Sequence, residues 1–237
     1  MPQKASIARS KNTGKVKTNQ RTPRAGSIVY EHVKSELLED AYRDLTHIPI
    51  EAIATELNVS RQPVMDAIKR LSAEGFVEII PQVGSRLRQY SPRDVIDFFE
   101  FFALIEAQLT SLAAIRANEE SIVSLRLLSA QIGTLPKLKK KPKDLGKLYR
   151  NLNRKFHLEI TNMADSKAVG DFVEILRDKA DYFITWEKRF SLAQHIETSV
   201  AEHEEIIDAI EAGDANLAAL KTKEHILSVD REWIIGE

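Results

Sequence analysis

Three histidines in the second half of the chain have a spacing that could form a metal site. Asn153 and His157 are four residues apart in a helical pattern, so they share one face of that helix. His203 lies ten residues before Gly213 and His225 lies twelve residues after it, on two helices predicted to be joined there. At about 1.5 Å per residue, both imidazoles lie roughly 15–18 Å from the turn, so a helical hairpin brings them together. Three imidazoles and one oxygen donor suit a divalent metal such as zinc or nickel.

Other interpretations of these histidines remain open at the level of sequence. Scattered histidines are more often surface residues or hydrogen-bonded core residues than metal ligands, and His32 and His195, which have no partner in the pattern, are predicted to be surface residues. A di-metal carboxylate enzyme would need Glu three residues before each ligand, whereas Arg154, Val200 and Thr222 stand there. The sequence also has no glycine-rich phosphate loop and no nucleophile elbow, so no enzyme is expected.

Composition limits the class of protein. The 237 residues are 43% hydrophobic with nine Gly and eight Pro, which fits about two folded domains. The net charge of −1 by itself favours neither nucleic acid nor a membrane. The absence of cysteine excludes disulfides, zinc ribbons and thiol catalysis. No apolar run approaches the roughly 20 residues of a membrane span and no apolar signal core is visible, so a cytoplasmic protein without a membrane partner is expected.

Residues 50–90 predict two short helices, a tight turn and a hairpin. Apolar residues recur at helical spacing over 50–57 and again over 64–71. Asn58 breaks the first helix and Ser60 can cap the second. Two such helices form a helix-turn-helix, whose second helix can enter the major groove of DNA. The β-rich run that follows, with turn residues at 81–85, predicts a wing.

The candidate DNA-contacting residues occupy outward positions of the second helix and of the wing: Ser60, Arg61, Gln62, Lys69, Arg70 and Gly84. Arg61 and Gln62 are expected to contact bases, because Arg pairs with guanine and Gln with adenine. Lys69 and Arg70 are expected to contact phosphates. At Gly84 the backbone could approach DNA closely.

Charge is distributed unevenly around this motif. Residues 1–25 contain seven basic residues and no acidic one, which is typical of a disordered basic arm. This arm is either a solvated terminus or a contact to DNA phosphates or a minor groove. Residues 26–90 contain seven basic and ten acidic residues. An acidic DNA-binding domain is unexpected, because neutralising phosphates supplies much of the affinity.

The rest of the chain is predicted to be entirely helical. Ser91 and Pro92 are typical of a helix start. Helical patterns follow over residues 92–117, 119–134, 144–163, 166–190, 194–212 and 214–234. They predict an antiparallel helical bundle over residues 91–237. The expected fold is therefore mainly α, with a small α+β winged helix-turn-helix before an all-α bundle.

Two stretches resemble a known family. Residues 57–64, 67–71, 74–77 and 81–84 resemble the winged helix of the GntR family of bacterial transcription regulators. This resemblance implies binding to double-stranded DNA. The chain departs from the family's pattern where Arg is usual, because it has Glu51, Met65, Gln82 and Val83 at those positions.

The bundle resembles the ligand domain of the FadR subfamily, often called the FCD domain. The matching residues are 153–157, 202–206, 209–214 and 224–225. Members often hold a metal with one Asp and three His, and small carboxylate effectors bind there. By this match His157, His203 and His225 take the His positions and Asn153 takes the Asp position. Asn153 is a neutral donor, so the metal is expected to bind more weakly.

The effector pocket also departs from the family's pattern. The family tends to carry an Arg four residues before a Glu that aligns with Glu106, and this chain has Phe102 there. Arg binds carboxylates through two parallel hydrogen bonds and Phe cannot, so Phe102 suits a less charged or more hydrophobic effector.

Together these features predict a ligand-responsive transcription regulator, expected to be a repressor. Residues 1–25 form the arm, residues 26–90 the DNA-binding domain, and residues 91–237 the effector-binding and dimerisation domain. The expected partners are an inverted-repeat operator, a second copy of the chain and a small effector such as an organic acid, with zinc or nickel as the cofactor. One alternative is a metal- or ligand-binding helical protein whose degenerate winged domain mediates protein contacts. The other is a metalloenzyme in the bundle.

Overall fold

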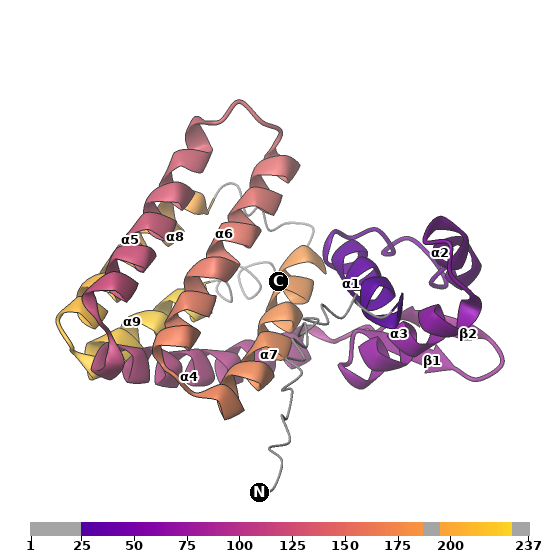
Figure 1. The fold of residues 1–237 in the computed structure, drawn as a ribbon, viewed down its shortest axis with the longest axis horizontal. Helices are drawn as coiled ribbons and strands as arrows, with labels where there is room; N and C mark the ends of the chain where they lie inside the picture. The colour runs from indigo at the N-terminus through magenta and orange to yellow at the C-terminus, as the bar shows by residue number, and fades with distance from the viewer. Residues whose placement is uncertain (1–24, 187–194, 229–237) are drawn as a thin grey trace, which may run out of the picture.

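The computed structural model describes residues 25–186 and 195–228, which form two bodies in Figure 1. A small winged domain lies at one end and a larger bundle of helices at the other. The predicted basic arm, up to residue 24, lies outside the described residues. The mainly helical architecture with one small hairpin confirms the predicted fold class.

The winged domain is built on a helix-turn-helix. Its elements are α1 (Ala25–Leu38), α2 (Ile50–Glu56), α3 (Arg61–Ala73), β1 (Val77–Ile80) and β2 (Gly84–Leu87). The strands pair antiparallel, with Val77 opposite Leu87. Asn58 has a positive φ of 50° just after α2, and Ser60 has an extended backbone just before α3. These two residues make the tight turn that the sequence predicts.

Within the described residues, the bundle consists of α4 (Pro92–Arg116), α5 (Glu119–Thr134), the 3₁₀ helix η1 (Leu135–Lys137), α6 (Pro142–Met163), α7 (Lys167–Trp186), α8 (Ile196–Glu211) and α9 (Ala215–Ser228). Ser91 and Asn118 start α4 and α5 with reciprocal capping boxes. Gly213, with a φ of 68°, turns the chain between α8 and α9, so that these helices form the predicted hairpin.

Helix α4 is the longest helix of the bundle. By length and composition it is the one helix among those described that could cross a membrane, because an 18-residue stretch of it has a mean hydropathy of 1.5. Half of that stretch is buried inside the protein. There α4 packs along α9 and carries the fully buried Glu106. These features are those of a core helix of the bundle.

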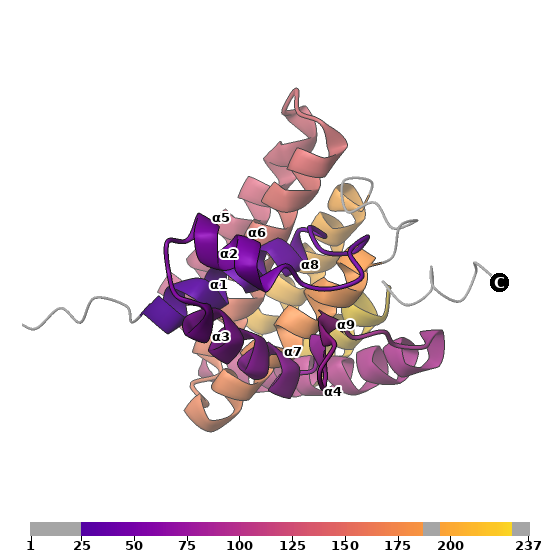
Figure 2. The same cartoon turned by 90° about the vertical axis from the view of Figure 1, so that its right-hand side faces the viewer.

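Helix α7 joins the two domains. Figure 2 shows the winged domain in front of the bundle, and α1 packs against α7. The Tyr182 hydroxyl donates to the Arg88 carbonyl at 2.8 Å, and the Lys179 ammonium donates to the Gly75 carbonyl at 2.8 Å. Asp178 forms an ion pair with Lys34 of α1. Apolar residues of both domains form one continuous core, so α7 sets the orientation of the winged domain.

Candidate functional site

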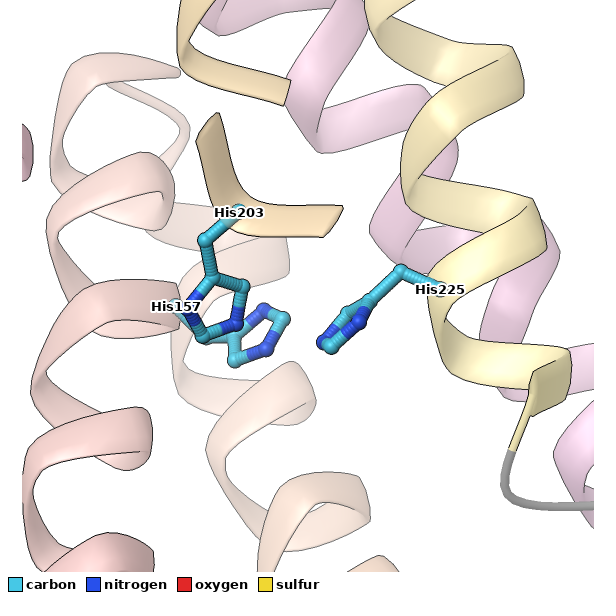
Figure 3. Close-up of side chains that lie close together, drawn as sticks. All are labelled: His157, His203 and His225. Atoms are coloured by element: carbon cyan, nitrogen blue, oxygen red, sulfur yellow. The ribbon is translucent and has the colours of Figure 1, made fainter. Parts of the chain in front are cut away.

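Three buried histidines converge inside the bundle. His157 comes from α6, His203 from α8 and His225 from α9, and their rings point toward one another in Figure 3. The ring centroids are 5.8 Å apart for His157 and His203, 5.4 Å for His157 and His225, and 4.8 Å for His203 and His225. One nitrogen of each ring lies within 4.8 Å of the others. The described structure therefore brings together the three histidines that the sequence singled out.

One of the three rings is hydrogen-bonded to a carboxylate, and a second ring lies close to another carboxylate. Nδ1 of His225 lies 2.7 Å from a Glu202 oxygen. Nδ1 of His157 lies 3.5 Å from a Glu106 oxygen, which is too long for a good hydrogen bond, and neither atom has a hydrogen-bond partner among the described residues. A carboxylate at Nδ1 favours the tautomer that carries its proton there, which leaves Nε2 with a lone pair. Histidines that bind metals usually have such a partner on the nitrogen away from the metal.

The third ring and the predicted oxygen donor are buried without partners. His203 is 0% exposed and stacks on Phe156, with ring centroids 3.9 Å apart. Neither of its nitrogens, nor Oδ1 of Asn153, has a hydrogen-bond partner among the described residues. Each such buried polar group costs about 1–3 kcal/mol unless something satisfies it. A cation between the imidazoles would bind one nitrogen of His203 and Oδ1 of Asn153, so these residues fit a divalent metal.

Two histidines of the cluster have lowered pKa values, which favour their neutral form. Burial, together with the neighbouring His225 and His157, holds the pKa of His203 well below its ordinary value. Burial also lowers the pKa of His157, although Glu106 opposes that shift. Both imidazoles are therefore neutral near pH 7, which is the form that ligates metals. Burial alone would raise the pKa of Glu106, but Arg177, whose Nη2 lies 2.6 Å away, and His157 hold it below its ordinary value.

A cavity adjoins the histidines. Its apolar wall comes from α4, α7 and α9 and consists of Phe99, Phe102, Ala180, Ile184 and Ile226. Its polar lining includes Arg150 and Asp181 as well as Asn153 and His157. The space open to the centres of water molecules is about 80 Å³. A buried position for one water needs about 10–15 Å³, so this cavity has room for a small organic molecule.

The sequence did not reveal several residues of this cavity. His195 was predicted to be a surface residue, which is wrong: it lines the cavity at the start of α8. Arg150, Arg177 and Asp181 were not singled out at all, and Glu202 was named only as part of the stretch that resembles the FCD domain. Arg177 could have been noticed from the sequence. It lies between Val173 and Ala180 at helical spacing on the buried face of α7, where an apolar residue is usual.

The candidate DNA-contacting residues of α3 are exposed, as a DNA-binding surface requires, but each of them pairs with an acidic side chain. Arg61 lies 3.2 Å from a Glu51 oxygen, and Gln62 donates to Asp66 at 2.9 Å. Lys69 lies 3.5 Å from the same Asp66 side chain. Arg70 forms a 3.0 Å ion pair with Glu74.

Ser60 and Gly84 lie at the edges of this surface. The Ser60 side chain is exposed and makes no capping hydrogen bond in the described part of the chain. Gly84 has a φ of 145°, and a side chain there would meet the His47 ring at 3.7 Å. The exposed end of the wing is instead Val83, at 60% exposure, with Pro81 and Gln82.

Comparison with known proteins agrees with this architecture. Residues 97–228 match the FCD domain, and residues 26–87 match the family described as bacterial regulatory proteins, gntR family. The chain is 27% identical over 179 residues to an uncharacterized HTH-type transcriptional regulator in an unstable DNA locus of Streptomyces ambofaciens, covering 75% of this chain and 71% of that protein. It is 23% identical over 201 residues to the HTH-type transcriptional repressor GlaR of Escherichia coli K12, and the match covers 84% of this chain and 91% of that protein.

A solved structure shares the fold of both domains. Escherichia coli McbR/YncC superposes with a TM-score of 0.74 at 15% identity, over 90% of this chain and 99% of that chain. The predicted absence of enzymatic activity agrees with these relatives, which are regulators. The FCD match alone spans more than half of the sequence. The chain belongs to the GntR family of bacterial regulatory proteins and is a transcription regulator with an N-terminal DNA-binding domain and a C-terminal ligand-binding FCD domain.

Proposed function

We propose that this regulator is a cytoplasmic, dimeric repressor whose FCD cavity binds a small effector through a divalent metal. His157, His203 and His225 would hold zinc or nickel, with Asn153 as a neutral oxygen donor. The observation that carries this proposal is the fully buried His203, neither of whose nitrogens has a partner among the described residues. When bound, the metal would supply a positive centre that ligates oxygen atoms of the effector.

The cavity favours an effector with one polar end and one apolar end. The histidines and Asn153 lie at its polar part, and Phe102, which is 3% exposed, belongs to its apolar wall. The Phe98 ring stacks on the Phe102 ring, with centroids 5.7 Å apart, and so packs behind that wall. An organic acid with a short hydrophobic body would fit both parts, because its oxygen atoms could reach the metal while its carbon atoms contact the aromatic wall.

Effector binding would reach the DNA-binding domain through α7. Arg177 and Asp181 line the cavity, whereas Asp178, Lys179 and Tyr182 on the same helix contact the winged domain. A small displacement of α7 would therefore move the winged domain. The effector would change operator affinity only if it binds the two positions of α7 with different affinities.

The dimer that we propose would form through α4. Phe101, Leu104 and Ile115 are 58%, 54% and 68% exposed, and their spacing places them on one side of this helix. Exposed apolar residues in a row are typical of an interaction surface. A two-fold dimer would present two recognition helices to an inverted repeat.

The repressor role is supported by relatives. GlaR and RspR of Escherichia coli K12 are transcriptional repressors and are 23% and 22% identical to this chain. Repression would follow if the effector-free dimer occupies the operator and the effector releases it. The basic arm at residues 1–25 would add phosphate contacts, so its deletion should lower DNA affinity and flatten the salt dependence.

Competition among random genomic DNA fragments tests the DNA-binding part of this proposal. The protein should retain a small set of fragments that share an inverted repeat. Arg61→Ala should then weaken binding to that repeat by about 1–3 kcal/mol and affect random DNA less. Retention without any sequence preference would instead favour the alternative in which the winged domain mediates protein contacts. The acid partners of Arg61, Lys69 and Arg70 are the observation in favour of that alternative.

A further inference from the structure

A second group of metal-binding side chains lies in the winged domain, far along the chain from the bundle histidines. His32 and Glu36 occupy one face of α1, and Glu56 is the last residue of α2. His32 was predicted to be a surface residue, and its side chain is 25% exposed. Its Nε2 lies 3.6 Å from a Glu36 oxygen and 3.6 Å from a Glu56 oxygen. The three donor atoms all lie within 4.8 Å of one another.

The separations suit a metal better than they suit hydrogen bonds. Ligands at about 2.0–2.2 Å from a tetrahedral zinc ion are roughly 3.3–3.5 Å from each other. The 3.6 Å separations are close to that value, and they exceed the length of a good hydrogen bond. Nε2 of His32 is buried and has no hydrogen-bond partner among the residues described here. A cation between the three groups would give this nitrogen a partner.

A neighbouring residue already orients one of the carboxylates. The Tyr42 hydroxyl donates a hydrogen bond to the Glu36 side chain. Outer hydrogen bonds of this kind fix the direction of a ligand before the metal arrives. The Glu36 side chain is 33% exposed and the Glu56 side chain is 59% exposed, so a metal ion can reach them from solvent.

We propose that His32, Glu36 and Glu56 form a second, weaker divalent metal site that takes zinc. Three protein ligands leave a fourth position for water, as in open zinc sites. The ion would join α1 to α2, the first helix of the helix-turn-helix, which otherwise packs mainly on α3. It would also offset two negative charges in a domain whose acidic residues outnumber its basic ones, ten to seven. This inference is independent of the metal site proposed in the bundle.

The same three groups could instead form an ordinary ion pair between a protonated His32 and its two carboxylates. Counting bound zinc at about pH 7.5 separates the two cases, because an ion pair binds no zinc. The experiment uses full-length protein that has been stripped with a chelator, dialysed and then equilibrated with zinc. Glu56→Gln removes one ligand at an exposed position, so the variant is expected to fold.

Glu51→Gln is the matched control, because Glu51 is an exposed carboxylate on the same helix and pairs with Arg61 instead. We expect Glu56→Gln to bind one zinc ion fewer per chain than the natural sequence, and Glu51→Gln to bind the same number. His32→Gln should lose the same ion as Glu56→Gln. Equal zinc counts for the natural chain and Glu56→Gln would overturn the proposal. If the bundle site alone fails, the natural chain binds one ion and Glu56→Gln binds none.

Discussion

Nη1 of Arg150, a residue of the FCD cavity, donates a 2.6 Å hydrogen bond to the carbonyl oxygen of Leu38 at the end of α1. The Thr185 hydroxyl donates to the same oxygen at 3.1 Å. The last carbonyls of a helix have no partner within that helix, so these two side chains complete the C-terminus of α1 from the other domain. Nε of Arg150 is buried and has no partner in the described part of the molecule. One guanidinium group therefore belongs both to the cavity and to the domain interface.

Arg150→Met should loosen the winged domain from the bundle. Methionine keeps an apolar stem but removes the charged donor, so the Leu38 carbonyl retains only Thr185. Hydrogen bonds to charged groups are worth about 1.5–3 kcal/mol, and a loss of about 1–2 kcal/mol in local stability is expected. Hydrogen exchange of the backbone amides at residues 36–42 should become faster.

Lys147→Met on the same helix is the control for Arg150→Met. Lys147 also reaches α1, through an exposed ion pair with Glu39 at 2.5 Å. Exposed ion pairs contribute only about 0–1 kcal/mol, so exchange should change little. Equal acceleration in both variants would show that Arg150 has no special role at the interface.

Glu51→Gln should increase the affinity for DNA of any sequence. Glu51 pairs with Arg61 and stands where the family usually has Arg, so its removal frees one cation on the recognition helix and removes one repulsive charge. On random DNA, where Arg61 has no matching base, the freed guanidinium would contact a phosphate instead, and each such contact steepens the dependence of log K on log salt by about 0.9. Fluorescence anisotropy with random duplexes at several salt concentrations measures this slope, and Glu119→Gln in the bundle is the control. An unchanged slope would mean that Glu51 does not restrain Arg61.

Asp181→Asn should stabilise the protein at neutral pH. Burial raises the pKa of Asp181 to about 6, against the opposing effects of Arg150 and Arg154. Because the folded pKa exceeds the unfolded value, the folded state holds this proton more tightly, and the resulting stability is lost as pH rises through 6. The variant cannot ionise, so its free energy of unfolding should exceed that of the natural chain by about 3 kcal/mol above pH 6.

The advantage of Asp181→Asn should shrink toward about pH 4, where both chains are neutral at this position. Urea unfolding at a series of pH values measures the difference. Asp171→Asn, an exposed position of the same helix, should change stability little at any pH. A benefit of Asp181→Asn that does not vary with pH would contradict the electrostatic explanation.

Glu202→Gln should weaken metal binding in the bundle without unfolding it. Glu202 lies 2.7 Å from Nδ1 of His225, and its side chain is 27% exposed. Loss of such an outer carboxylate typically costs about 10- to 100-fold in metal affinity. Competition with a chromogenic chelator measures the affinity, and Glu205→Gln on the exposed side of α8 is the control. Equal affinities for the two variants would show that Glu202 does not orient His225.

Periodic patterns made most of the fold predictable. Buried residues repeat at helical spacing in every bundle helix, and Ser91, Asn118 and Gly213 mark the ends of helices by their local chemistry. The turn at Gly213 also predicted that His203 and His225 would meet, because equal distances from a hairpin turn imply equal heights. These relationships are local, or depend on one turn, so a single sequence contains them.

Contacts between distant helices were not predictable in the same way. Glu106 and Arg177 form a buried pair across 71 residues, and Arg150 reaches Leu38 across 112. Which face of one helix meets which face of another depends on packing of the whole bundle, and no spacing within a helix encodes it. His195 was misjudged for this reason, because it lines a cavity built from several helices. For His32 only Glu56 comes from another helix, since Glu36 lies four residues further along α1.

The metal content of purified protein shows whether the three bundle histidines hold a metal ion. The untagged Glu56→Gln variant, purified without chelator or added metal, isolates the bundle site from the one proposed in the winged domain. We expect close to one divalent metal ion per chain, and loss of that ion when His203 and His225 are both changed to Gln while the helical content is retained. No metal in the Glu56→Gln protein, even after soaking with zinc or nickel, would show that the three histidines do not form a metal site.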